Sequence, residues 1–272
     1  MKPAPFSLLI PDTIDEAVSA LAEYGDAARV IAGGQSLMAM MNMRLAEPDY
    51  LIDIARINEL KRIEVTPKGV SVGAAVTQSA LASHAEAMAK VPLIAEALTH
   101  VGHVQTRNRG TVCGSLCHAD PSAELPLLLC LLEGTVTLRS TQGERTLSAE
   151  SFQTGMLSTA KRADEIVVSA FFPAAPKNAR TGFHEIARRH GDFAIVALAC
   201  IVEERSVRFA VGGVGDTPLA VNWPNLDPAS LDEKLNALAW RLGGYDDIHA
   251  SARYRRELIR RAGATLIRET ML

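Results

Sequence analysis

Two short segments rich in small residues constrain this chain more than any other feature of its sequence. The first, AGGQSL, covers residues 32–37, and the second, NRGTVCGSLCHADPSAELP, covers residues 108–126. Adjacent glycines let backbone N–H groups point outward together, because no Cβ atom blocks a ligand. A diphosphate group is the natural occupant of such a turn. Each segment alone is a weak signal, since two glycines after a strand more often form only a tight turn.

The second segment strengthens the prediction of a dinucleotide. Asp120 and Glu124 follow its glycines, and their carboxylates can bind ribose hydroxyls or amide protons of a ligand. We expect the segment to offer further backbone amides and hydroxyls at Gly110, Thr111, Gly114 and Ser115. The chain contains neither G-x-G-x-x-G nor G-x-x-x-x-G-K-[ST], which disfavours a Rossmann or P-loop site. Two separate segments can instead hold one dinucleotide from two sides.

The cysteines of the second segment raise the alternative of a metal site. Cys113 and Cys117 are four residues apart, with His118 adjacent, whereas zinc ribbons use paired C-x-x-C knuckles. No spacing typical of an iron–sulfur cluster is present. Cys130 and Cys200 stand in apolar runs, where a thiol behaves as a small hydrophobic group. We therefore expect four packed thiols and no metal ligand in this chain.

The composition is that of an ordinary globular protein. At 272 residues the chain can bury one large core or two smaller ones, with 48% hydrophobic and 22% charged residues. A net charge of −3 gives no sign of a nucleic-acid surface. Only ARYRRELIRRAG (252–263) is locally basic, and the helical spacing of its arginines indicates a solvated helix face. We expect no nucleic-acid partner.

Nothing in the sequence indicates a secreted or membrane protein. The start, MKPAPFSLLIPDTIDEA, lacks the apolar run and cleavage site of a signal peptide. The run LLLCLLEG is far shorter than the roughly 20 residues that a membrane span needs. Four cysteines without a secretion signal indicate reduced thiols. We expect a cytoplasmic protein with no membrane span.

Hydrophobic periodicity predicts a mixture of strands and helices without strict alternation, which is typical of α+β domains. Helices are expected over 13–25, 77–102 with a break or new start at Pro92, 125–133, 227–244 and 251–270. Strands are expected over 28–34, 50–57, 70–77, 135–140, 145–147, 164–173, 181–189, 193–204 and 206–221. Residues 192–200 fit both the strand and the helix period. The segment PAAPKNAR (173–180) predicts a domain boundary.

Taken together, these motifs resemble those of a known family. AGGQSL and TRNRGTVCGSLCHADPSAELP are similar to the two flavin-binding signatures of molybdenum hydroxylase flavoproteins. These are the FAD-binding medium subunits of the carbon monoxide dehydrogenase and xanthine dehydrogenase family. The resemblance covers essentially the whole chain and includes NMRLAEPDYLIDI, GAAVTQSAL, ARRHGDFAIVALA and FAVGGVGDTP. Each motif is modest, but their order and spacing are specific.

The resemblance implies a fold as well as a cofactor. It predicts an FAD-binding domain of the vanillyl-alcohol-oxidase type over 1–175, with two α/β subdomains split near 55–60. It also predicts a smaller C-terminal domain over 176–272, with an antiparallel sheet and helices. The expected class is therefore α+β.

The resemblance also implies which residues bind FAD. Residues 32–37 and 110–115 are expected around the diphosphate, Asp120 and Glu124 near the ribose and adenine, and Phe193 beside the isoalloxazine ring. His184 stands where relatives can carry a lysine, so a positive charge there requires a protonated imidazole. Core packing is the alternative for Phe193 and Val167. The full predicted set is Val30, Ile31, Ala32, Gly33, Gly34, Gln35, Ser36, Leu37, Val101, Thr106, Asn108, Gly110, Thr111, Val112, Cys113, Gly114, Ser115, Cys117, Asp120, Glu124, Val167, His184 and Phe193.

The function implied by the resemblance is electron transfer. A flavin exchanges electrons singly or in pairs, and the protein positions it and sets its potential. No general acid–base pair or nucleophilic triad is readable, so no catalytic side chain is predicted. The implied partners are a small subunit with two [2Fe–2S] clusters and a large subunit with a molybdopterin cofactor, in a dimer of heterotrimers. Electrons would leave through FAD to NAD⁺, a quinone, oxygen or another acceptor.

Two other functions remain open from the sequence. One is a free-standing FAD oxidase, although the C-terminal segment of about 95 residues is small for a substrate domain. The other is an assembly module that has lost its flavin. The presence of both glycine segments argues against this alternative. The substrate of the complex, whether carbon monoxide, an aldehyde, a purine or an N-heteroaromatic compound, is set by a different polypeptide.

Overall fold

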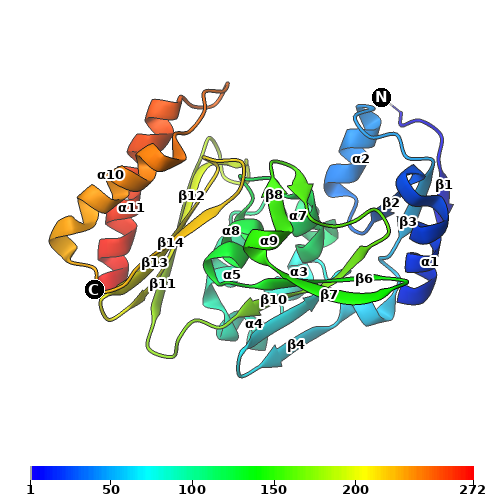
Figure 1. The fold of residues 1–272 in the computed structure, drawn as a ribbon, viewed down its shortest axis with the longest axis horizontal. Helices are drawn as coiled ribbons and strands as arrows, with labels where there is room; N and C mark the ends of the chain where they lie inside the picture. Colours follow the sequence, from blue (N-terminus) through cyan, green and yellow to red (C-terminus); the bar gives the residue numbers. More distant parts are fainter. Residues whose placement is uncertain (1) are drawn as a thin grey trace.

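The computed structural model describes residues 2–272 and contains three main β-sheets that follow one another along the chain. Figure 1 shows the first sheet at one end of the molecule, the second in the middle and the third at the other end. Strands and helices do not alternate strictly, which confirms the mixed α+β class. No helix in the described part of the chain combines the length and apolar character needed to cross a membrane.

The first sheet is parallel and carries the first small-residue segment. Its order is β1–β3–β2, at Ser7–Leu9, Tyr50–Asp53 and Ala28–Ile31. Parallel strands need crossover connections, and helix α1 (Ile14–Tyr24) supplies the one from β1 to β2. The Thr13 hydroxyl accepts the Glu16 N–H at 3.2 Å, which caps α1 where the sequence predicts its start. Helix α2 (Gln35–Asn42) follows β2 after a three-residue turn.

The second sheet is antiparallel, in the order β4–β5–β10–β6–β7. These strands are Ile63–Thr66, Gly69–Gly73, Ile166–Pro173, Thr135–Ser140 and Gly143–Ser148. The predicted hairpin over 135–147 is confirmed as β6–β7. The sequence pattern missed β4, because it is a short edge strand whose side chains alternate between half-buried and exposed.

Seven short helices and a small hairpin lie between β5 and β10 in the sequence. They are α3 (Gln78–Ala82), α4 (Ala85–Lys90), α5 (Pro92–Leu98), α6 (Val104–Arg109), α7 (Val112–His118), α8 (Glu124–Leu131), α9 (Ala149–Phe152), β8 (Gln153–Gly155) and β9 (Ser158–Thr159). Pro92 occupies the first turn of α5, which confirms the predicted new helix start. Helix α8 is buried almost all round, which accounts for its continuous apolar sequence.

The third sheet is antiparallel and has helices on one face. Its strands β11 (Arg180–Ala187), β12 (Ala194–Glu203), β13 (Ser206–Gly212) and β14 (Leu219–Trp223) pair in sequence order. Helices α10 (Leu231–Leu242) and α11 (Ala252–Met271) cover the outer face, while the other face is turned toward α8 and α5 (Figure 1). This arrangement agrees with the predicted C-terminal sheet and helices.

Strand β12 resolves the ambiguity between strand and helix over residues 192–200. It is buried on both faces, so its apolar run lacks the alternation that marks a half-exposed strand. Ala197 and Ala199 join the core that includes α8, whereas Leu198 and Cys200 join the core under α10 and α11. Apart from Ile201, the side chains of β12 in the first core are alanines, whereas those in the core under α10 and α11 are larger.

The predicted boundaries fall in connections between elements. The boundary at 175/176 lies between β10 and β11, and the split near 55–60 lies between β3 and β4. One hydrophobic core spans the first two sheets and reaches the alanines of β12. The division into domains and subdomains remains a prediction.

The interpretation of the basic stretch 252–263 as a solvated helix face is wrong for Arg255. Its side chain is almost wholly buried and donates to the carbonyl oxygens of Ile195 and Gly213, the latter at 2.8 Å. It also donates to Asp247 at 2.7 Å and covers the ring of Tyr245. Arg255 therefore fastens α11 to the ends of β12 and β13, a role that helical spacing alone does not reveal.

Replacing Arg255 with alanine should lower the free energy of unfolding, because two buried carbonyl oxygens and Asp247 would lose their hydrogen-bond donor. Breaking such a buried pair costs about 3 kcal/mol of unfolding free energy. Urea denaturation of Arg255→Ala measures this cost. Arg260→Ala, which removes a more exposed arginine of the same helix paired only with Glu257, should cost less than about 0.5 kcal/mol. Equal losses for the two variants would contradict the assignment.

Candidate cofactor-binding site

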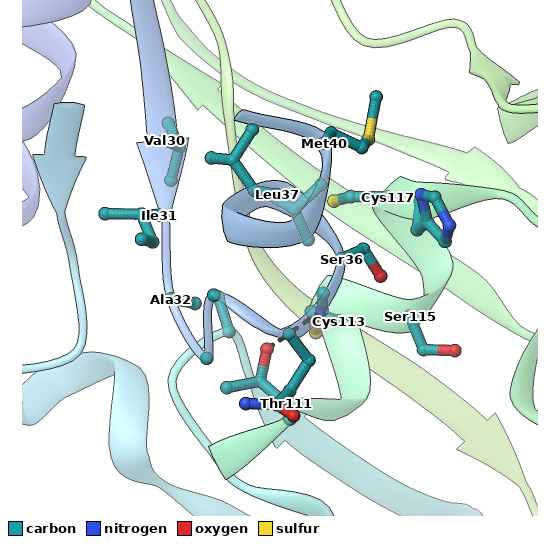
Figure 2. Close-up of a pocket in the computed structure, with 18 of the residues that line it drawn as sticks. Val30, Ile31, Ala32, Ser36, Leu37, Met40, Thr111, Cys113, Ser115 and Cys117 are labelled. Carbon is teal, nitrogen blue, oxygen red and sulfur yellow. Dashed lines mark hydrogen bonds between the residues drawn. The ribbon is translucent and has the colours of Figure 1, made fainter. Parts of the chain in front are cut away.

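The two small-residue segments lie against each other in the folded chain. A Cβ atom added to Gly33 would collide with the carbonyl oxygen of Arg109 and stand 2.8 Å from the Cα of Gly110. Figure 2 shows the turn after β2, with Ala32 and Ser36, running beside the Thr111–Ser115 segment. Because an L-side chain cannot fit at this contact, only glycine at position 33 lets the two backbones meet.

The first segment presents free backbone donors. Gly34 adopts the left-handed conformation (φ 70°) and begins α2 without any side-chain cap. The first intrahelical bond runs from Met38 N–H to Gly34 C=O, so the amides of Gln35, Ser36 and Leu37 have no acceptor within the helix. Free amides at the positive end of a helix suit a phosphate group.

The second segment contributes less of its backbone than the sequence predicts. The amides of Gly110, Val112, Gly114 and Ser115 already bond within the protein, to Thr106, Val76 and Thr111. Gly114 bonds the Thr111 hydroxyl at 3.0 Å, which caps α7. The prediction of exposed amides is therefore wrong for Gly110, Gly114 and Ser115. What the segment offers instead is a wall of small side chains with the Ser115 hydroxyl in it.

A cavity of about 730 Å³ lies along this contact, within the size range of ligand pockets. Most of the residues predicted from the sequence line it. They are Val30, Ile31, Ala32, Gly33, Gly34, Gln35, Ser36, Leu37, Val101, Thr106, Gly110, Thr111, Cys113, Gly114, Ser115, Cys117, Glu124, Val167 and Phe193. Two segments 75 residues or so apart in sequence thus build one pocket, as a dinucleotide clamp requires.

Three predicted residues of the second segment lie outside the lining. Asn108 accepts a hydrogen bond from Ser79 at 2.6 Å on the exposed side of α6. Val112 is fully buried in the core. Asp120 accepts the Ser122 N–H at 2.8 Å, so its carboxylate closes the turn between α7 and α8.

His184 also lies outside the lining, because of strand alternation. It pairs with Leu198 of β12, whose side chain belongs to the core under α10 and α11. Directly opposite residues share a face of the sheet, so His184 is on the side away from α8. The neighbouring Phe183 and Glu185 pair with Ala199 and Ala197, which face α8.

Two loops meet at another part of the pocket. Gly191 has φ 86°, and a Cβ there would stand 2.8 Å from Cε1 of His103 and 3.0 Å from the carbonyl oxygen of Gly102. Phe193 follows and is 64% exposed, which rules out core packing as its explanation. Val167, by contrast, is buried in the core and also lines the cavity.

Several lining residues escaped the sequence reasoning. Gln78 is the clearest, because its Oε1 is buried without any hydrogen-bond partner and lies 3.2 Å from where a Cβ of Gly110 would be. Its backbone N–H donates to Gly110 C=O at 2.8 Å, which fixes it against the second segment. Arg29 and Lys161 also line the pocket and bring positive charge. A polar residue inside the motif GAAVTQSAL was the only available signal for Gln78.

The two cysteines of the pocket are not in the thiolate form that binds a metal. Burial raises the pKa of Cys117 to about 11 and that of Cys113 well above its usual value, so both thiols are neutral near pH 7. Among residues 2–272, no group of three or more His, Cys, Asp or Glu side chains is arranged to hold a metal ion. Burial, together with the charge of Arg29, lowers the pKa of Lys161, as expected for two neighbouring cations.

Comparison with known proteins places the chain in a family. A model of the FAD binding domain in molybdopterin dehydrogenase matches residues 4–175. The chain belongs to this family of FAD-binding medium subunits. It is 35% identical over 274 residues to the nicotine 6-hydroxylase medium subunit of Paenarthrobacter nicotinovorans, covering 96% of this chain and 94% of that protein.

Other relatives show the same likeness. The present chain is 33% identical to the carbon monoxide dehydrogenase medium chain of Hydrogenophaga pseudoflava, and the match covers 80% of this chain and 78% of that protein. A chain of quinoline 2-oxidoreductase from Pseudomonas putida 86 matches the fold with a TM-score of 0.92 and 32% identity, covering 100% of both chains. This medium subunit is therefore an oxidoreductase subunit with an FAD-binding domain and a C-terminal antiparallel sheet with helices.

Replacing Gly33 with alanine should force the two segments apart. Because the added Cβ meets backbone atoms, we expect the unfolding free energy to fall by about 2 kcal/mol and FAD binding to be lost. Urea denaturation and flavin fluorescence measure the two effects. Gly155→Ala is the matched control, since its Cβ would have no neighbour closer than 3.9 Å. A Gly33→Ala protein with unchanged stability and flavin binding would show that the contact is not needed.

Proposed function

We propose that this medium subunit binds one FAD in the pocket and passes electrons from the [2Fe–2S] clusters of a partner subunit to an external acceptor. The observation that carries the proposal is the close contact of Gly33 with Arg109 and Gly110 beside the free amides of α2. This contact makes one pocket of the two segments. The family, which is one of FAD-binding subunits, supplies the identity of the ligand.

The pocket fits FAD in its donors and its charge. The amides of Gln35, Ser36 and Leu37, with the Ser115 hydroxyl opposite, would hold the diphosphate. Arg29 and Lys161 offset its negative charge. The further predicted contacts are the lining residues named above, with Phe193, at the exposed part of the pocket, placed where it would pack beside a bound flavin ring.

The chemistry comes from the cofactor, and the chain supplies the setting. Bound FAD exchanges electrons singly with one-electron carriers and in pairs with a two-electron acceptor. Buried apolar residues such as Val101, Cys113 and Val167 exclude water from one side of the pocket. The exposed side chain of Phe193 marks the side open to an acceptor or a partner subunit. A small iron–sulfur subunit and a large molybdopterin subunit, in a dimer of heterotrimers, are the proposed partners.

Purification of the tagged chain from its native host tests this function. We expect equimolar flavin, two co-purifying subunits, iron and molybdenum. Removal of the flavin should abolish turnover with the external acceptor, and added FAD should restore it. A flavin-containing chain with no partner that oxidises a substrate directly would instead show a free-standing oxidase. A chain without flavin would show an assembly module.

Gln78 gives a second prediction for the same pocket. Its buried Oε1 has no donor, so Gln78→Leu should leave the unfolding free energy unchanged or raise it. FAD should bind about tenfold more weakly, because the carboxamide can no longer bond the ligand. Flavin fluorescence titration and urea denaturation separate the two effects. The exposed residue Gln142 provides the control, and Gln142→Leu should change neither. A Gln78→Leu protein with full affinity would remove Gln78 from the site.

A further inference from the structure

Glu124 is a buried carboxyl group in the wall of the pocket that Arg29 and Lys161 also line. It begins α8, is only 6% exposed and lines the cavity. The residues that follow it, Leu125 to Leu129, are buried apolar side chains and one proline. Among the ion pairs of residues 2–272, none includes Glu124. A buried carboxylate without a cation is costly, and the bond that Glu124 accepts from its own backbone N–H does not offset burial, so the group favours its protonated form.

Glu165 shows within the same molecule what a buried carboxylate needs. It is as buried as Glu124, but Arg145 bonds both of its oxygens, at 2.6 and 2.8 Å, and the Arg162 N–H adds a third bond. These bonds outweigh burial and lower the pKa of Glu165. Burial without such partners raises the pKa of Glu124 to about 8. Glu165 thus has an arginine partner that Glu124 lacks.

A second carboxyl group, that of Glu185, also favours the protonated form of Glu124. Glu185 pairs with Ala197 across β11 and β12, so its side chain lies on the face of the sheet turned toward α8. Its Oε2 is buried and has no hydrogen-bond partner. Burial raises the pKa of Glu185 to about 7, and its charge, followed by that of Asp120, raises the pKa of Glu124 further.

No other charged group of residues 2–272, including Arg29 and Lys161 of the same pocket, forms an ion pair with Glu124 or Glu185. The elements packed against α8 and β11, with the turns that follow them, carry Glu96 on α5 and His100 after it, His118 on α7 and Asp120 after it, Glu150 on α9, Glu203 on β12, Arg208 on β13 and Arg255 on α11. Arg208 pairs with Glu133 beyond the far end of α8, and Arg255 pairs with Asp247. Burial lowers the pKa of His100, with the charges of His190 and His184 adding to the effect, so near pH 7 it is neutral.

We infer that Glu124 is a protonated carboxylic acid at neutral pH, kept so by its burial and by Glu185, and that FAD binds this protonated form. The part concerning FAD rests on the proposed function. The protonated group can donate a hydrogen bond into the pocket, whereas the ionised group would repel a ligand that carries a diphosphate. Binding therefore favours the proton, and by linkage FAD binds more weakly once Glu124 ionises.

The pH dependence of FAD affinity tests the inference on the full chain. Because only the protonated form binds, the Kd of the wild-type chain should rise about tenfold between pH 7 and pH 9. Glu124→Gln keeps a neutral donor, so its Kd should stay nearly flat over this range. Glu185→Gln removes a charge that holds the proton, so the rise in Kd should begin at a lower pH. Glu133→Gln, an exposed change beyond the same helix, should behave like wild type.

Unfolding without FAD gives a readout that does not depend on the proposed function. A carboxyl group whose pKa is raised by folding favours the folded state when protonated, so stability falls as pH rises from its unfolded pKa to its folded one. The unfolding constant of the wild-type chain should therefore increase between pH 5 and pH 8, by up to about tenfold per pH unit for each such group. Glu124→Gln should remove part of this slope.

The outcomes separate the two proposals. If the wild-type chain binds no FAD at any pH but its unfolding constant still increases with pH, the proposed function and the FAD part of the inference are overturned. The increase with pH would then still support the proton on Glu124. FAD binding with the same pH dependence in wild type and Glu124→Gln would overturn the inference alone. If Glu124→Gln fails to fold, Glu185→Gln decides, because an unshifted Kd profile in that variant would equally contradict the inference.

Discussion

The approach of Gly33 to the backbone of Arg109 and Gly110 is the contact on which the rest of this structure depends. It brings the turn after β2 of the first sheet against the end of α6, just before α7 begins. Without it the free amides of α2 would face solvent, and the small side chains of residues 110–115 would have nothing to enclose. A missing Cβ atom is thus what makes two distant segments into one pocket.

Some buried polar groups in and near this pocket lack a usual partner. Most buried carboxyls and amides in proteins are hydrogen-bonded, and Arg255 and Glu165 show how completely this chain satisfies such groups elsewhere. Gln78 and Glu185 are the exceptions with buried unpartnered oxygens, and Glu124 lacks a cation. Such groups cost stability in the free chain, which is what a site prepared for a polar ligand entails.

The sequence predicted the elements well where local signals were strong. Thr13 marks the start of α1, Pro92 starts α5, and the small residues of segments 32–37 and 110–115 indicate the pocket. Prediction from the sequence failed where the position of a side chain depends on partners distant in sequence. Arg255 looked solvated because nothing local shows the carbonyl oxygens of Ile195 and Gly213.

Within the predicted site, too, the sequence does not show which face of a strand a side chain lies on or which amides are already bonded. His184 and Glu185 are neighbours in sequence, yet the pairing register of β11 with β12 puts them on opposite faces of the sheet. Asp120 turns back to Ser122, and most amides of the second segment are bonded internally. Such assignments depend on register and capping, which residue types alone do not determine.

Amide hydrogen exchange with and without FAD tests the central claim most directly, since it reports on both segments at once. The account predicts that one equivalent of FAD slows exchange in residues 33–37 and in residues 111–115 together. Protection of only one segment, or of neither, would contradict the view that both close on a single ligand.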